Sequence, residues 1–269
     1  MAVVSAFKDG SDALRANPVL LVAGLLVGIG SQLQYVGRLI DSPILSTGVS
    51  LAWLVVFPFV LGGFIGTARA AIEGTNASLT GFFAAAATHY RALLGGTVAF
   101  VLLVFGTAVG LGFAGVVFGI GAMALATVNE VAAFAVGVGS VVIWLVSILV
   151  VVTFVQFYDT AIVIENKSVT ESLRRSIDLV RSNPKSVAGF SVVWVALLNA
   201  FLVPEYLLQV TLTDASPVDV VPIDPGLPIA VLLPIGITLS AIGFAYLYTV
   251  YTAYYMRLTA TSPAPAESI

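Results

Sequence analysis

Three ionisable residues, Arg69, Asp159 and Arg257, lie at the ends of long apolar stretches and are the strongest candidates for chemistry in this sequence. Ionisable groups close to the hydrocarbon of a membrane are costly and are usually paired or turned toward a cavity. If the three stretches end at the same depth, Asp159 can bridge the two arginines. The pattern predicts a charge clamp that holds the ends together, with a gate or a substrate contact as the alternative.

Other kinds of reactive site find little support in the composition. The chain has no cysteine and one histidine, His89, which excludes thiolate nucleophiles, disulfides and multi-histidine metal sites. It also offers no paired carboxylates for general acid–base work. The sequence therefore predicts no enzyme activity, no cofactor and no metal site. The net charge of −3 argues against nucleic acid as a partner.

The composition is that of a membrane protein, with 59% hydrophobic and 9% charged residues, where a soluble domain has about 25% charged residues. A helix needs about 20 apolar residues to cross the hydrocarbon, so charge-free runs predict an all-α protein with six transmembrane helices. The runs are Ala16–Gly37, Ser42–Ala68, Ala92–Asn129, Val131–Tyr158, Ser186–Pro204 and Gly226–Met256. We interpret the third as one long helix preceded by an interfacial piece, since splitting it would reverse the topology downstream.

Positive charge lies on one side of these runs. Of the 11 Lys and Arg residues, only Arg38 falls on the other side. The remaining ones are Lys8, Arg15, Arg69, Arg91, Lys167, Arg174, Arg175, Arg181, Lys185 and Arg257. Because cytoplasmic loops carry the excess of Lys and Arg, we expect a multi-pass protein of the cell membrane with both termini in the cytoplasm.

Short repeats divide the chain into three units. The segment Asn76–Thr80 recurs as Asn166–Thr170, and Leu14–Pro18 resembles Val180–Pro184. We expect one transmembrane domain over residues 1–257, made of parallel two-helix repeats at about 1–70, 76–160 and 166–257. Each repeat is preceded by a cytoplasmic amphipathic helix, and residues 258–269 form a disordered tail.

The third of these cytoplasmic helices has the clearest pattern. Ser168–Glu171 is a capping box, and apolar residues recur at helical spacing after it. The basic residues around it predict contact with anionic lipid headgroups. They are Lys167, Arg174, Arg175, Arg181 and Lys185. The alternative is a helix that only sets topology and caps the bundle.

Glycines four residues apart mark the third run, as the pairs Gly106–Gly110 and Gly115–Gly119. Small residues at this spacing let two helices approach closely. We expect these glycines to pack against a helix of the same bundle, with dimerisation as the alternative.

The run Phe157–Glu165, followed by Ser172–Ser176 and Asn183-Pro184, resembles haloarchaeal multi-pass membrane proteins of unknown function. It is more distantly similar to the membrane domain beside some bacterial glycerophosphodiester phosphodiesterases. The acidic and histidine cluster of that chemistry is missing here, so no catalytic residue carries over. The resemblance implies a membrane module without assigned activity, and the acidic, lysine-poor composition favours a salt-adapted host.

Two functions fit these patterns. The first is a non-enzymatic scaffold or accessory subunit that organises membrane lipids or a protein partner through its basic helices. The second is a small-solute or lipid transporter or channel, with a path between the three repeats. Transport sites usually place charged groups at mid-membrane, whereas here they cluster at the ends of the runs, which favours the first function.

Overall fold

The structure, a computed structural model, describes residues 2–33, 40, 42–213 and 229–261. Within these residues every regular element is helical, which confirms the predicted all-α class. In chain order the helices are α1 (Ala2–Ala16), α2 (Val19–Gln32), α4 (Pro43–Ile72), α5 (Leu79–Ala126), α6 (Glu130–Val155), α7 (Tyr158–Glu165), α8 (Val169–Ser182), α9 (Pro184–Thr213) and α10 (Ile229–Thr261).

Short polar residues define where several helices begin and end. Ser42, Ser78 and Asn129 are the N-caps of α4, α5 and α6, and each side chain accepts the backbone N–H three residues on. Such caps pair amide groups that a helix leaves free at its start. At the other end of an element, Asn166 ends α7 with a left-handed φ of 53°, a conformation that asparagine tolerates.

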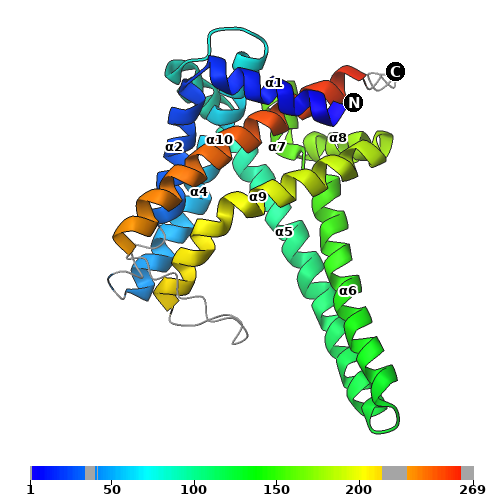
Figure 1. Cartoon of the computed structure of the whole chain (residues 1–269). Coiled ribbons are helices and arrows are strands. Elements are labelled where there is room, and N and C mark those ends of the chain that lie inside the picture. Colours follow the sequence, from blue (N-terminus) through cyan, green and yellow to red (C-terminus); the bar gives the residue numbers. More distant parts are fainter. Residues whose placement is uncertain (1, 34–39, 41, 214–228, 262–269) are drawn as a thin grey trace.

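The helices form two legs that diverge from a common end (Figure 1). In the first leg, α2 and α4 pack with α10, and α9 lies against α10. The second leg consists of the later part of α5 and its antiparallel partner α6, which we call the arm. The helices α1, α7 and α8 gather with the last turns of α10 at the end where the legs meet (Figure 1).

The short helix α7 lies at the centre of that common end. Its Tyr158 and Ile162 pack with residues of α4 and α5, including Ile65 and Leu93. Its Ala161 faces a second apolar cluster with residues of α8, α9 and α10. The helix α7 is therefore packed against α4 and α5 on one side and against α8, α9 and α10 on the other.

The helix α5 is a single unbroken element of 48 residues, about 72 Å long at 1.5 Å per residue. The one-helix interpretation of this region is therefore correct. The preceding interfacial piece, however, is not separate, because residues 79–91 are the first turns of α5 and run beside α4. The Tyr90 hydroxyl donates to the carbonyl oxygen of Val55 in α4 at 3.3 Å.

Among the residues that the structure describes, five helices are long and apolar enough to cross a membrane, and a sixth span results if α1 and α2 are counted together. These two helices meet at an angle of 97°, at the residues Asn17 and Pro18 between them. The second and sixth predicted runs correspond closely to α4 and α10. The fifth run, Ser186–Pro204, agrees with the apolar span Pro184–Val203, although α9 itself continues to Thr213.

Two details of the predicted layout differ from the structure. Residues 258–261 belong to α10 instead of a disordered tail, and the rest of that tail lies outside the described residues. Separate helices precede the first and third predicted repeats, whereas in the second the corresponding residues are continuous with α5. Arg38 also lies outside the described residues.

Candidate functional site

The helix is interrupted between α6 and α7 at Gln156 and Phe157, and we call this interruption the α6–α7 break. A serine of α8 forms hydrogen bonds across it. The hydroxyl of Ser176 accepts the backbone N–H of Phe157 at 3.0 Å and donates to the carbonyl of Phe154 at 2.8 Å. Tyr251 of α10 donates its hydroxyl proton to the carbonyl of Gln156. Backbone groups that the break removes from the helical ladder thus find partners in two other helices.

Asp159 follows this break in the first turn of α7, and it is 5% exposed. Its Oδ1 accepts the backbone N–H of Thr160 at 2.7 Å and the hydroxyl of Tyr251 at 3.4 Å. Among the described residues, no Lys or Arg forms an ion pair with it. Asp159 is therefore a buried acid held by neutral donors at the start of a helix, where the helix dipole favours negative charge.

The predicted clamp of Arg69, Asp159 and Arg257 is not formed. Arg69 pairs with Glu73 on its own helix at 2.8 Å and donates to the carbonyl of Ile164 at 3.1 Å. The physical reason is local: a carboxylate four residues along the same helix is within reach before any tertiary contact forms. Arg69 therefore contacts the C-terminal end of α7, whereas Asp159 lies near its start.

Arg257 also has a different partner from the one expected. Its guanidinium Nε lies 2.6 Å from Oδ2 of Asp9 in α1. Both side chains are partly exposed, at 41% and 33%, so this pair contributes at most about 1 kcal/mol. Its effect is to join the first helix of the chain to the last, and the sequence analysis missed it because Asp9 and Arg257 are distant in the sequence.

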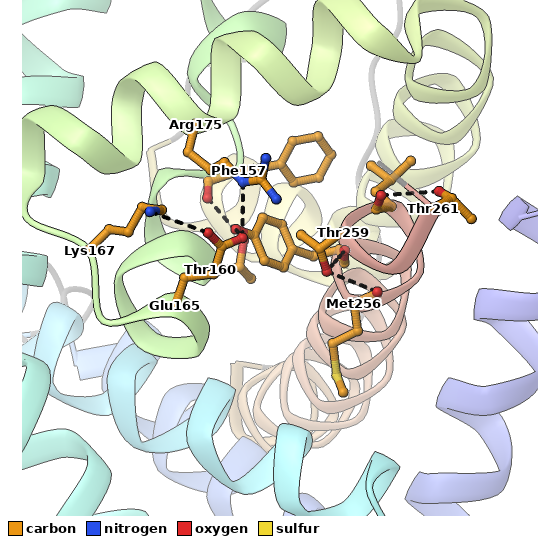
Figure 2. A network of polar contacts seen from close by, with 10 residues as sticks. Phe157, Thr160, Glu165, Lys167, Arg175, Met256, Thr259 and Thr261 are labelled. Atoms are coloured by element: carbon orange, nitrogen blue, oxygen red, sulfur yellow. Dashed lines mark hydrogen bonds and ion pairs between the residues drawn. The ribbon is translucent and has the colours of Figure 1, made fainter. Parts of the chain in front are cut away.

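A second polar cluster surrounds Glu165 at the far end of α7 (Figure 2). Glu165 Oε1 lies 3.1 Å from Nε of Arg175 and accepts the hydroxyl of Tyr255 at 2.6 Å. The ammonium of Lys167 lies 3.7 Å from Oε2. One carboxylate thereby ties α7 to α8 and α10.

The basic residues predicted to contact lipid consequently divide into two groups. Arg175 and Lys167 are paired with Glu165 within the protein. The other three, Arg174, Arg181 and Lys185, are exposed and form no ion pair within the described part of the chain. Only these three remain available to an anionic headgroup.

Among the described residues, the four α5 glycines have no close neighbour of the kind that their spacing predicts. A Cβ added at Gly106, Gly110, Gly115 or Gly119 would meet no atom within 4 Å among the neighbours considered. Close packing occurs elsewhere: a Cβ on Gly63 of α4 would lie 2.8 Å from the carbonyl oxygen of Phe82 in α5. The α5 glycines have the spacing that allows close packing, but they belong to the arm, where the described part of the chain places no third helix against them.

Glu165 and two tyrosines of α10 were not predicted as site residues, for identifiable reasons. Glu165 was noticed only as the end of a motif, although its neighbours Lys167 and Arg175 are opposite in charge. Tyr251 and Tyr255 of α10 are one helical turn apart, a spacing that places them on one face, and both are buried. Their buried hydroxyls are the tertiary hydrogen-bond partners of Gln156, Asp159 and Glu165.

This arrangement is suited to fixing helices and is not suited to binding a metal ion. In the described part of the chain, no three His, Asp or Glu residues come together in a way that could hold one. The site pairs two buried or half-buried carboxylates with hydroxyl, amide and guanidinium donors from the three helices α7, α8 and α10.

No curated protein and no solved structure matches the chain. One protein family does match it, described as a domain of unknown function (DUF7847), over residues 1–258. That range includes the α6–α7 break and both carboxylate clusters, and it agrees with the predicted resemblance to a family of unknown function. The chain belongs to the DUF7847 family.

Proposed function

We propose that this protein is a non-enzymatic integral membrane protein that acts as a scaffold or accessory subunit and organises lipids or partner proteins. The observation that carries the proposal is the arm. Among the described residues, α6 has one buried residue, Val155. The part of α5 that follows Gly96 also has one, Ala122. Two long apolar helices that bury so little within their own chain must be covered by lipid or by another membrane protein.

The basic end of the molecule supports the same function. Arg174, Arg181 and Lys185 are exposed there, on the side where α1, α8 and the end of α10 gather (Figure 1). Under the positive-inside rule this end is cytoplasmic, and each basic residue near an anionic surface contributes about 1 kcal/mol. We therefore propose six spans in three repeats, cytoplasmic termini, and anionic lipid as a partner.

Two finer expectations belong to this proposal as well. The acidic, lysine-poor composition supports an origin in a salt-adapted archaeon. The motif around Phe157–Glu165 supports a distant relationship to the membrane domain that accompanies glycerophosphodiester phosphodiesterases. Neither implies an activity for this chain.

A small-solute or lipid transporter or channel, with its path between the three repeats, is the second candidate. Asp159 favours it, because an ionisable group buried at a helix break without a cationic partner is a common feature of transport sites. Against it, the environment of Asp159 is filled by the aromatic residues Phe157, Tyr158 and Tyr251.

Photo-cross-linking in the native membrane tests whether the arm binds a protein. Benzoylphenylalanine is placed at Phe113 or Phe134 of the arm, both 73% exposed. The control positions are Ile44 of α4 and Val192 of α9, which are 88% and 70% exposed. We expect one discrete protein adduct from the arm positions and none from the controls. The same set of products from all four positions would contradict a role for the arm.

Competition between lipids tests the basic end. The purified protein is exposed to equal amounts of phosphatidylglycerol and phosphatidylcholine with identical chains, and bound lipids are counted by native mass spectrometry. We expect a preference for phosphatidylglycerol that disappears when Arg174, Arg181 and Lys185 are replaced by glutamine. Replacing Lys8, Arg15 and Arg91 instead removes the same charge and controls for net charge alone. An equal loss in both triple variants would contradict a specific site on α8 and α9.

A further inference from the structure

The backbone carbonyl of Gln156 has lost its helical partner at the α6–α7 break. In an unbroken helix this carbonyl accepts the backbone N–H of Thr160, four residues on. Here that N–H donates to Oδ1 of Asp159 at 2.7 Å, and the carbonyl accepts the hydroxyl of Tyr251 instead. The side chain of Asp159 therefore occupies the amide that would continue the helix, and Tyr251 replaces that amide at the carbonyl.

The hydroxyl of Tyr251 has two polar neighbours and only one proton. The carbonyl of Gln156 can only accept a hydrogen bond, and it is the nearer of the two. Oδ1 of Asp159 lies 3.4 Å from the same hydroxyl oxygen. An ionised Asp159 would have to share the single tyrosine proton with the carbonyl. A protonated Asp159 removes this competition, because it donates its own proton to the tyrosine oxygen, and the three groups then form a continuous chain of hydrogen bonds.

No ion pair compensates a negative charge on Asp159. Its side chain is 5% exposed and pairs with no Lys or Arg in the described part of the chain. The cations of the helices packed on α7 act elsewhere, because Arg69 of α4 and Arg175 of α8 contact Ile164 and Glu165 at its other end. Burying an ionised carboxyl without a cation is costly, and such a group is usually neutralised by a proton.

Hydroxyls and aromatic rings make up the surroundings of Asp159. Three tyrosines of α7 and α10 interact electrostatically with its carboxyl. They are Tyr158, Tyr248 and Tyr251. From α5, Thr97 shares a hydrogen bond with the Tyr158 hydroxyl at 3.1 Å. From α9, Phe190 packs on the Tyr251 ring, with the two centroids 6.2 Å apart. These neighbours can accept or donate hydrogen bonds, but they bring no positive charge.

We propose that Asp159 is a proton-binding site that controls the hydrogen bonds of the α6–α7 break. With the proton bound, the carboxyl donates to Tyr251, and Tyr251 donates to the carbonyl of Gln156. When the proton leaves to water, the hydroxyl of Tyr251 turns toward the carboxylate, and the carbonyl of Gln156 loses its donor. The only covalent bond broken is the O–H bond of Asp159. The site does not rest on the scaffold function, because it lies in α7 and α10 and not in the arm.

Infrared spectroscopy of the protein in phosphatidylcholine vesicles tests for the proton directly. The carbonyl stretch of a protonated carboxyl is separate from the carboxylate and amide bands, and 13C in the aspartate side chains identifies its origin. We expect one such band at neutral pH that is absent from Asp159→Asn. The control is Asp178→Asn, which removes an exposed aspartate of α8 and should keep the band. Raising the pH should remove the band from the wild type in one titration step.

The same spectra test the link to the break. With 13C at the glutamine backbone carbonyls, raising the pH should move one labelled band to higher frequency, because the carbonyl of Gln156 loses its donor. This change should be absent from Asp159→Asn. In Tyr251→Phe the acid has no acceptor, so its own carbonyl band should move to higher frequency at neutral pH.

Three results would overturn the proposal. The first is the absence of an Asp159-dependent carboxyl band at neutral pH, which shows that the group is ionised. The second is a carboxylate band of Asp159 that changes with Na⁺ or K⁺ at that pH, which places a metal cation there instead of a proton. The third is a labelled glutamine carbonyl that does not respond when Asp159 loses its proton. All three are measured on the wild type and Asp159→Asn, so they stand even if Tyr251→Phe does not fold.

Discussion

At the scale of single residues, the best-defined feature is the hydrogen-bonded closure of the α6–α7 break. Ser176 is fully buried and serves at once as acceptor and donor for two backbone groups of the break. The sequence marked this serine only as part of a motif. Its role could not be predicted, because it depends on α8 folding back over residues 154 to 157 by a path that no local spacing encodes.

Replacing Ser176 with alanine should lower the free energy of unfolding by about 1–3 kcal/mol, because the buried Phe157 N–H loses its acceptor. The measurement is thermal or denaturant unfolding in detergent. Ser182 lies on the same helix and is exposed, so Ser182→Ala should change stability by less than about 0.5 kcal/mol. Equal effects of the two substitutions would show that the break does not depend on Ser176.

Asp159 gives a second prediction at this scale. An arginine clamp and the observed hydrogen bonds to neutral donors predict different effects of Asp159 substitutions on stability. Asparagine keeps an oxygen that can accept from Thr160 and Tyr251, so Asp159→Asn should change stability by less than about 1 kcal/mol. Asp159→Leu removes the acceptor and should cost about 1–3 kcal/mol. A large loss of stability in Asp159→Asn would contradict this prediction. It would show that the negative charge of Asp159 matters and that an arginine is its partner.

At the scale of elements, periodicity and capping residues were informative. The apolar runs located α4, α6 and α10, and the box at Ser168 formed as predicted, with the backbone N–H and the hydroxyl of Ser168 both donating to Glu171. The contacts of each helix could not be read in the same way. A glycine spacing indicates that close approach is sterically possible, and only the tertiary path decides whether a second helix is there.

The contrast between α4 and α5 makes this testable. Gly63→Ala places a Cβ 2.8 Å from a backbone carbonyl oxygen of α5 and should cost about 1–3 kcal/mol through forced separation of the helices. Gly110→Ala meets open space and should be neutral or stabilising by up to about 1 kcal/mol, because alanine favours a helix more than glycine does. Thermal unfolding of both variants measures these two changes in stability. Destabilisation by Gly110→Ala would indicate that a helix covers that face.

The stability of the first turn of α8 should depend on pH. Hydrogen bonds from the hydroxyl and then the backbone N–H of Ser168 lower the pKa of Glu171. A carboxyl with a lowered folded-state pKa stabilises above its ordinary pKa of about 4.3, and that contribution is lost as pH falls through the lowered value. Amide exchange in the first turn of α8 should therefore accelerate at low pH beyond its intrinsic change. In Glu171→Gln this extra pH dependence should be absent, and its persistence would assign it to another group.

At the scale of the whole molecule, the membrane character follows from composition, because only the bilayer can solvate so apolar a chain. The divergence of the legs could not be predicted. Residues that face lipid and residues that face another helix are equally apolar in a membrane, so hydropathy carries no signal for whether α5 and α6 join the bundle. The arm is thus the feature that most needs experimental explanation.

Native mass spectrometry of the protein, extracted gently from its own membrane, tests the scaffold function most directly. The account predicts a second protein in a fixed ratio to this chain, and its loss when the exposed arm residues Phe113 and Phe134 are replaced by serine. Replacing Ile44 and Val192 with serine instead should leave the complex intact. A chain that is recovered alone, or with a reproducible small molecule and no protein, would contradict the scaffold function and favour transport.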